Sequence, residues 1–213
     1  MEVGNRGNFM RGKIRYDTTL YIVQLKDILV TDRLTEDIFT GINAGRARNT
    51  GLELWTHCLL YPENGQHPFN AILSLGYTLS SNRFIEFIDD GIDYSGSSLP
   101  GIPVQKLNSI LTGETGPVEM KLQYQYTGSQ WMNDANDEKY ESYHLTHFQV
   151  GWKRLLSSIP VSIEIHGGIR NLFNTHYASM ILVNAPSFGG TPPRYYYPGL
   201  PRQFHLGISL RFR

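Results

Sequence analysis

The chain has 213 residues, of which 40% are hydrophobic and 18% charged, and its 19 basic residues balance its 19 acidic ones. This balance excludes a nucleic-acid binder with a basic face, the many order-forming residues exclude a disordered chain, and the single cysteine excludes a disulfide framework. No apolar run approaches the roughly 18 residues of a transmembrane helix, so these numbers alone describe a soluble domain.

The first eleven residues lack the apolar stretch and the small-residue cleavage site of a signal peptide. Taken literally, this predicts a cytoplasmic protein. The alternative is a piece of a longer protein whose targeting signal lies upstream.

Alternation of apolar and polar residues runs through the chain, and helical spacing is nearly absent, so we expect an all-β antiparallel fold. The alternation predicts nine strands, at residues 2–10, 14–32, 38–60, 69–88, 103–114, 117–130, 139–155, 161–171 and 203–213.

The expected connections alternate in length. The short ones are 10–13, 61–68, 114–117 and 156–160; the longer ones are 33–37, 89–102, 131–138 and 172–202. The first of the longer set is only modestly long, so the asymmetry is clear at the other three.

A soluble β-sandwich also alternates, but three features favour an up-and-down membrane barrel. Several strands exceed the 9–11 residues that cross a bilayer, short turns alternate with longer loops, and aromatic residues gather at strand ends as in interfacial girdles. In such a barrel the apolar side chains that face lipid are balanced by the polar side chains that face a water-filled lumen. This balance explains a mean hydropathy of −0.30.

Under this interpretation alternate side chains face lipid and lumen. The expected lipid-facing residues are Val118, Met120, Leu122, Phe204, Leu206, Ile208, Leu210 and Phe212. The expected lumen-facing residues are Glu119, Lys121, Gln123, Glu164, His166, His205 and Arg211.

A sheet in lipid must close, and bacterial single-chain barrels have even strand numbers. Nine strands therefore indicate part of a larger barrel, or a miscounted strand.

Six segments resemble those of one family, the TonB-dependent outer-membrane receptors. They are EVGNRG at 2–7, LYIVQLKDIL at 20–29, NAGRARNTGLEL at 43–54, GSSLPGIP at 96–103, IRNLFNTHY at 169–177 and YPGLPR at 197–202. The segment at 43–54 is the most specific, and their order and spacing cover nearly the whole chain.

The resemblance implies that residues 1–213 are the C-terminal portion of a 22-stranded barrel, without plug domain or signal peptide. It implies uptake of a large scarce nutrient, such as a ferric siderophore, across the outer membrane of a Gram-negative bacterium. The implied partners are outer-membrane lipid, the plug domain and remaining strands, and the TonB complex, with no cofactor and no nucleic acid.

The sequence also offers candidate ligand contacts in the loops. Trp131, Arg194, Tyr195, Tyr196 and Tyr197 would contact a ligand, although interfacial anchoring explains the aromatic residues as well. The 172–202 loop is the best candidate for ligand contact, although a gating loop and an inert ordered loop are equally compatible with the sequence.

Neither a metal site nor an enzyme is expected. His144 and His147 are three residues apart and should face opposite sides of a strand. No Gly-x-Ser-x-Gly nucleophile pattern is present. An independent small outer-membrane barrel, either a channel or an adhesin, and a soluble β-sandwich binding module remain as alternatives.

Overall fold

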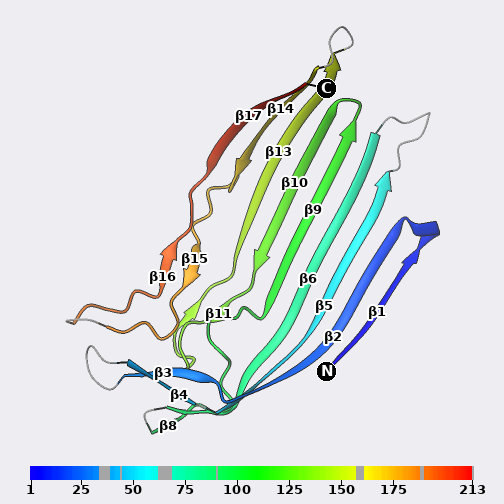
Figure 1. Ribbon diagram of the computed structural model, residues 1–213. Coiled ribbons are helices and arrows are strands. Elements are labelled where there is room, and N and C mark those ends of the chain that lie inside the picture. Colours follow the sequence, from blue (N-terminus) through cyan, green and yellow to red (C-terminus); the bar gives the residue numbers. More distant parts are fainter. Residues whose placement is uncertain are drawn as a thin grey trace.

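The alternating segments form long strands, and nine of them make one antiparallel sheet in chain order (Figure 1). This computed structural model describes residues 1–33, 39–43, 45–61, 69–89, 91–156, 161–187 and 190–212. The sheet consists of β1 (Glu2–Phe9), β2 (Ile14–Lys26), β5 (Arg46–Tyr61), β6 (Phe69–Glu86), β9 (Gln105–Thr115), β10 (Val118–Thr127), β13 (Tyr143–Leu156), β14 (Val161–Arg170) and β17 (Gln203–Phe212).

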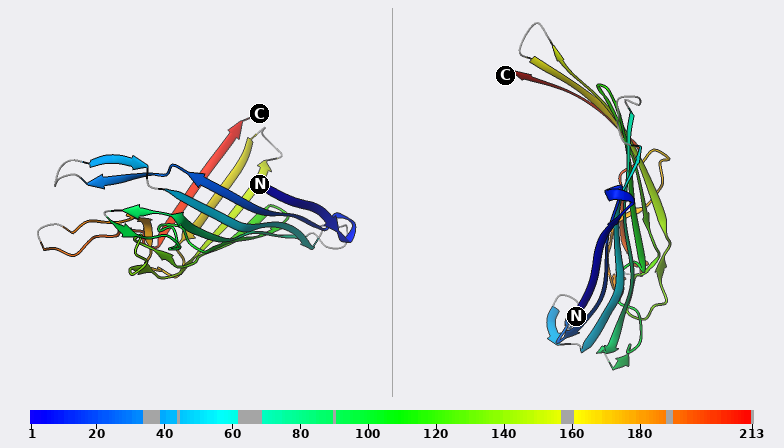
Figure 2. Two further views of the ribbon diagram at one scale, coloured as in Figure 1. Left: turned by 90° about the horizontal axis from the view of Figure 1, so that it is seen from below. Right: turned by 90° about the vertical axis from the view of Figure 1, so that its right-hand side faces the viewer.

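The expected all-β antiparallel fold is confirmed. The sheet is a curved, open surface whose first and last strands, β1 and β17, do not pair with one another (Figure 2). It is a single layer, whereas a β-sandwich packs two sheets face to face. No helix among the described residues has the length and apolar character needed to cross a membrane.

Four small hairpins extend the long connections beyond the same end of the sheet, which we call the long-loop end (Figure 1). They pair β3 (Leu29–Arg33) with β4 (Phe39–Asn43), β7 (Ile88–Asp89) with β8 (Ile92–Asp93), β11 (Gln130–Trp131) with β12 (Lys139–Tyr140), and β15 (Ala178–Ile181) with β16 (Tyr196–Pro198). The other end, which we call the short-turn end, has a 3-10 turn at Met10–Gly12 and the tight turn between β9 and β10.

The continuous strands expected at 14–32 and 38–60 are wrong. The sheet strands stop at Lys26 and restart at Arg46, because Asp27 (φ 55°) and Gly45 (φ 98°) take left-handed conformations. A side chain at residue 45 would also collide with the carbonyl oxygen of Glu86. The first long connection is therefore longer than expected and contains a hairpin of its own, β3 paired with β4.

The strand expected at 139–155 is also divided, because residues 139–140 belong to a loop hairpin and β13 starts at Tyr143. The expected connections at 33–37, 61–68 and 156–160 lie largely outside the described residues, as does the end of the last strand at residue 213.

Strand register gives the sheet two continuous faces, because residues paired across antiparallel strands share a face. One row crosses all nine strands and contains Phe9, Ile14, Cys58, Leu73, Leu111, Leu122, Phe148, Ile169 and Phe204. We call this side the apolar face.

The adjacent row points to the opposite side, which we call the polar face. It contains Asn8, Arg15, His57, Ser74, Ile110, Gln123 and His147. Only Ile110 among these seven is apolar.

The best-packed hydrophobic cluster lies at the long-loop end of the sheet. Phe87 is fully buried there, with Phe84 and Ala47 nearly so, and Ile28, Tyr94 and Leu99 pack against them. The aromatic rings of Phe84 and Phe87 are 4.3 Å apart between centroids. This cluster anchors the base of the loops to the ends of β5 and β6.

A close approach between β2 and β5 depends on a glycine of the polar face. A β-carbon at Gly51 would lie 2.6 Å from the ring of Tyr21 and 2.6 Å from the carbonyl oxygen of Leu79. At Gly76, on the same face of the neighbouring strand, a β-carbon would meet no atom within 4 Å.

We predict that Gly51→Ala lowers the free energy of unfolding by about 1–3 kcal/mol, because the added methyl group overpacks the Tyr21 contact. Gly76→Ala is the matched control and should change it by less than about 0.5 kcal/mol. Urea unfolding of the natural protein containing this chain, in detergent, measures both. Equal effects of the two substitutions would contradict the packing account.

Candidate functional site

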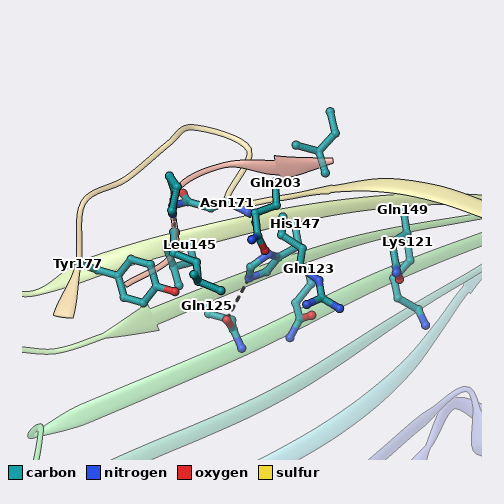
Figure 3. Close-up of a pocket in the computed structure, with 13 residues that line it drawn as sticks. Lys121, Gln123, Gln125, Leu145, His147, Gln149, Asn171, Tyr177 and Gln203 are labelled. Carbon is teal, nitrogen blue, oxygen red and sulfur yellow. Dashed lines mark hydrogen bonds between the residues drawn. The ribbon is translucent and has the colours of Figure 1, made fainter. Parts of the chain in front are cut away.

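The polar face forms a recess toward the long-loop end of β10, β13, β14 and β17 (Figure 3). Its volume is about 470 Å³. Its polar lining comes from Lys121, Gln123, Gln125, His147, Gln149, Arg170, Asn171 and Gln203. Four of these are glutamines, so the recess presents neutral donors and acceptors together with two cationic groups.

His147 connects the recess to the loop above it. Its Nε2 lies 3.2 Å from Oε1 of Gln125, and the backbone N–H of Asn171 donates to its Nδ1 at 3.2 Å. Because Nδ1 accepts, the neutral ring carries its proton on Nε2 and donates to Gln125. This arrangement fixes the orientation of the imidazole.

Asn171 anchors the start of the 171–202 connection. Its side chain is buried, its Oδ1 accepts from the N–H of Thr175 at 2.8 Å, and its Nδ2 donates to the carbonyls of Thr175 and Leu200 at 2.9 and 3.2 Å. Its backbone is left-handed (φ 51°), a conformation that asparagine tolerates. We therefore assign Asn171 the role of holding both ends of the longest loop together.

The long loops form hydrogen bonds with one another as well as with the sheet. Asn184 Nδ2 donates to Oδ2 of Asp134 at 2.6 Å, and the N–H of Asp134 donates back to Oδ1 of Asn184 at 3.0 Å. Asn136 bonds Ser98 through its Oδ1 and its Nδ2, at 2.7 and 3.0 Å. Three loops thus form one connected layer.

Asp134 is the ionisable member of this layer. Burial raises the pKa of its carboxyl group, while the hydrogen bond from Asn184 opposes the rise and the nearby charge of Asp89 adds to it. The folded layer therefore favours a protonated Asp134 more than solvent does.

The five candidate ligand-contact residues lie on two adjacent hairpins. Trp131 lies in β11, with the ammonium of Lys139 5.5 Å from its ring centroid. Tyr196 and Tyr197 lie in β16 and are each 55% exposed, while Arg194 and Tyr195 precede them. The hairpins are connected through Tyr140, whose ring centroid is 5.6 Å from that of Tyr196.

The residues expected to face the lumen all lie on the polar face. Glu119, Lys121 and Gln123 alternate along β10 with residues of the other face, and Lys121 Nζ lies 3.9 Å from Oε1 of Glu119. Glu164 pairs with Lys153, and Arg211 with Ser162.

Two histidines of the polar face lie over glycines of the adjacent strand. His166 is paired with Gly207 and His205 with Gly168, and a β-carbon at either glycine would overlap the imidazole ring. The missing side chains thus provide the space that seats both rings.

The residues expected to face lipid all lie on the apolar face. Val118, Met120 and Leu122 pair with Trp152, Val150 and Phe148. Phe204, Leu206, Ile208, Leu210 and Phe212 pair with Ile169, Gly167, Ile165, Ile163 and Val161.

The histidine pair considered for a metal site is separated by the sheet. His144 pairs with Tyr126 in a row of the apolar face, and His147 pairs with Gln123 on the polar face. No group of three His, Cys, Asp or Glu residues within the described segments is arranged to hold a metal ion.

Sequence reasoning missed the bonds between loops. Asp134 and Asn184 are 50 residues apart, and Asn136 and Ser98 are 38 residues apart. No local pattern predicts such pairs, although the left-handed Asn136 and Asn184 (φ 57° and 52°) are typical of tight turns.

The fold and its two faces define a class of protein, an antiparallel β-barrel segment with tight turns at one end and long ordered loops at the other. The chain belongs to the TonB-dependent receptors: residues 1–172 match the model of the family described as TonB dependent receptor-like, beta-barrel.

Solved structures of such receptors share this fold. The siderophore receptor PiuA from Acinetobacter baumannii is 16% identical with a TM-score of 0.72, covering 98% of this chain and 27% of its own. The ferric yersiniabactin uptake receptor FyuA from Yersinia pestis is 18% identical with a TM-score of 0.68, covering 99% and 29%. The ferric citrate transporter FecA in its unliganded form is 16% identical with a TM-score of 0.71, covering 99% and 30%.

The chain therefore spans less than a third of the length of these receptors. This share fits the open sheet, since nine strands form an arc of the barrel rather than a closed one.

We predict that Asn171→Ala lowers the stability of the 171–202 loop by about 2 kcal/mol, because the part-buried hydrogen bonds of the Asn171 side chain to the backbone groups of Thr175 and Leu200 are lost. Limited proteolysis of the natural protein should then cleave this loop faster. Asn171→Gly should also loosen the loop, but by about 1 kcal/mol less, since glycine accepts the left-handed backbone. Cleavage at the wild-type rate in both variants would refute the anchoring role.

Proposed function

We propose that this chain forms part of the outer-membrane barrel of a TonB-dependent receptor that imports a large scarce nutrient, such as a ferric siderophore. The observation that carries the proposal is the apolar row that crosses all nine strands, from Phe9 to Phe204. A continuous apolar face of this extent needs an apolar environment.

The bilayer is the environment that fits the apolar face. Phe204, Leu206 and Ile208 are 73%, 76% and 65% exposed in the isolated chain. Each square ångström of apolar surface that leaves water stabilises the folded state by roughly 25 cal/mol. Lipid would cover these side chains without the second sheet that a soluble sandwich requires.

The polar face would line the lumen and contact a plug domain. Its amides, histidines and scattered charges suit a hydrated interface that a polar partner occupies. The unpaired edges of β1 and β17 would join the remaining strands of the barrel, since an open edge is not tolerated in lipid. Energy would come from the TonB complex through the N-terminal part of the receptor.

The nutrient is proposed from the loops and from the family. The similar solved structures are receptors or transporters for ferric complexes and siderophores. Tyr196, Tyr197, Trp131 and Arg194 present aromatic and cationic groups that could stack on and pair with an anionic ferric chelate. Such capture requires no covalent chemistry, so we propose transport and not catalysis.

An independent small barrel receives no support from the geometry. Its strands would have to close on themselves, whereas β1 and β17 remain apart (Figure 2). Odd-numbered closure would also be unusual for a bacterial single-chain barrel.

The proposal predicts that the natural protein containing this chain fractionates with the outer membrane and is needed for uptake of ⁵⁵Fe-loaded siderophores. Catecholate, hydroxamate and citrate chelates form the test panel. The double variant Tyr196→Ala/Tyr197→Ala should weaken uptake of the cognate chelate by about tenfold, as expected for loss of aromatic binding contacts.

Phe9→Ala, at the short-turn end of the sheet and 58% exposed, is the control and should leave uptake unchanged. Recovery of the protein in the soluble fraction without detergent would refute the membrane assignment. Uptake of every chelate at the wild-type rate after deletion of the gene would refute the nutrient assignment.

A further inference from the structure

A second recess, of about 770 Å³, lies on the apolar face near the N-terminal edge of the sheet. Val3, Leu20, Leu52 and Leu79 form a cross-strand row through β1, β2, β5 and β6 that lines it. Val3 and Leu20 are 60% and 59% exposed. The recess is largely apolar and lies on the side that the proposed function assigns to lipid.

From the row at Leu52 toward the long loops, the cross-strand rows of this face become polar in a definite order. Two residues further along the strands, Ile22, Thr50 and Ser81 form a row that introduces two hydroxyl groups. After two more residues, Gln24, Arg48 and Arg83 form the next row. Strands rise about 3.3 Å per residue, so the arginine row lies about 13 Å from the row at Leu52.

Arg48 and Arg83 are directly opposite one another on β5 and β6. Like charges in this position destabilise a sheet unless an anion compensates them. Both side chains are exposed, and Lys26 adds a third cation on the next row.

The acidic residue of the next row, Glu86, does not neutralise this pair. Glu86 is engaged by Arg46, whose Nε and Nη2 donate to the same carboxylate oxygen at 2.9 and 2.6 Å. Among the described residues, Arg48 has no hydrogen bond or ion pair, and Arg83 makes one long side-chain hydrogen bond, 3.4 Å, to the carbonyl of Gly96. Two guanidinium groups therefore retain donors for an external anion.

We propose that this surface binds a lipid with an anionic phosphate headgroup, an inference that rests on the proposed membrane location. Its acyl chains would lie along the recess at Leu20, Leu52 and Leu79. Its phosphate would lie between Arg48 and Arg83, which can form charge-assisted hydrogen bonds to it.

A lipid with an anionic headgroup would occupy both the apolar recess and the space between the two arginines, whereas a simpler ligand would occupy one of them. Free phosphate would leave the apolar recess unused, and an uncharged lipid would leave the arginine pair unneutralised. The hydroxyl groups of Thr50 and Ser81 lie at the level where a lipid changes from hydrocarbon to headgroup. An arginine on the lipid face near the membrane–water interface also costs little free energy, about 0–1 kcal/mol, and less than it would at the bilayer midplane.

Binding of phosphatidic acid to the detergent-purified natural protein tests the proposal, with native mass spectrometry as the readout. Diacylglycerol with the same acyl chains and inorganic phosphate are the comparison ligands. We expect phosphatidic acid to bind at least about tenfold more tightly than either one.

The double variant Arg48→Gln/Arg83→Gln should lose this preference, so that phosphatidic acid binds about as weakly as diacylglycerol. Lys13→Gln/Arg15→Gln removes the same charge at the short-turn end of β2 and should keep wild-type binding. Equal binding of phosphatidic acid to wild type and the Arg48/Arg83 variant would overturn the site, as would equal binding of diacylglycerol to wild type.

Failure of the lipid site can be distinguished from failure of the proposed function. If the protein fractionates with the outer membrane while the arginine variant binds phosphatidic acid normally, only the lipid site is refuted. If inorganic phosphate binds as tightly as phosphatidic acid, the arginines form a simple anion site and the lipid assignment is wrong. Recovery of the protein without detergent would instead refute the membrane location.

Discussion

Register is the constraint on which the rest of this structure depends. A strand alternates its side chains with a period of two, so a slip of one residue between neighbours would exchange the two faces of the sheet. The row from Phe9 through Leu111 to Phe204 shows that no such exchange occurs across eight consecutive pairings. The apolar face, the polar recess at His147 and the arginine pair at Arg48 and Arg83 all follow from this register.

The sheet and the loops are stabilised differently. Side chains of the apolar face remain exposed in the isolated chain, and their burial depends on what surrounds the sheet. The loops instead contain Phe87, which is fully buried, and hydrogen bonds between side chains and backbone such as those of Asn171. A loop layer ordered by its own contacts can present Tyr196 and Tyr197 on a defined surface, which a receptor requires for recognition.

Much of the sheet could be predicted from the sequence, because alternation in segments such as Val118–Thr127 reports directly on the strand and its two faces. The ends of strands were less predictable. The residues of β3 and β4 directly follow and precede those of β2 and β5, and the left-handed backbone at Asp27 and Gly45 separates the hairpin from the sheet strands. The bond between Asp134 and Asn184 and the juxtaposition of Arg48 with Arg83 were invisible, since both depend on pairing between distant segments.

The central claim is that lipid covers one face of this sheet and water the other. Site-directed spin labelling along β10, residues 118–127, in the membrane-embedded natural protein tests it most directly, with Cys58 and any other native cysteine replaced. The account predicts that labels at 118, 120, 122, 124 and 126 are accessible to molecular oxygen. Labels at 119, 121, 123, 125 and 127 should be accessible instead to a polar relaxation reagent or shielded by the lumen. Access of the polar reagent to both sets alike, or an inverted pattern, would contradict the account.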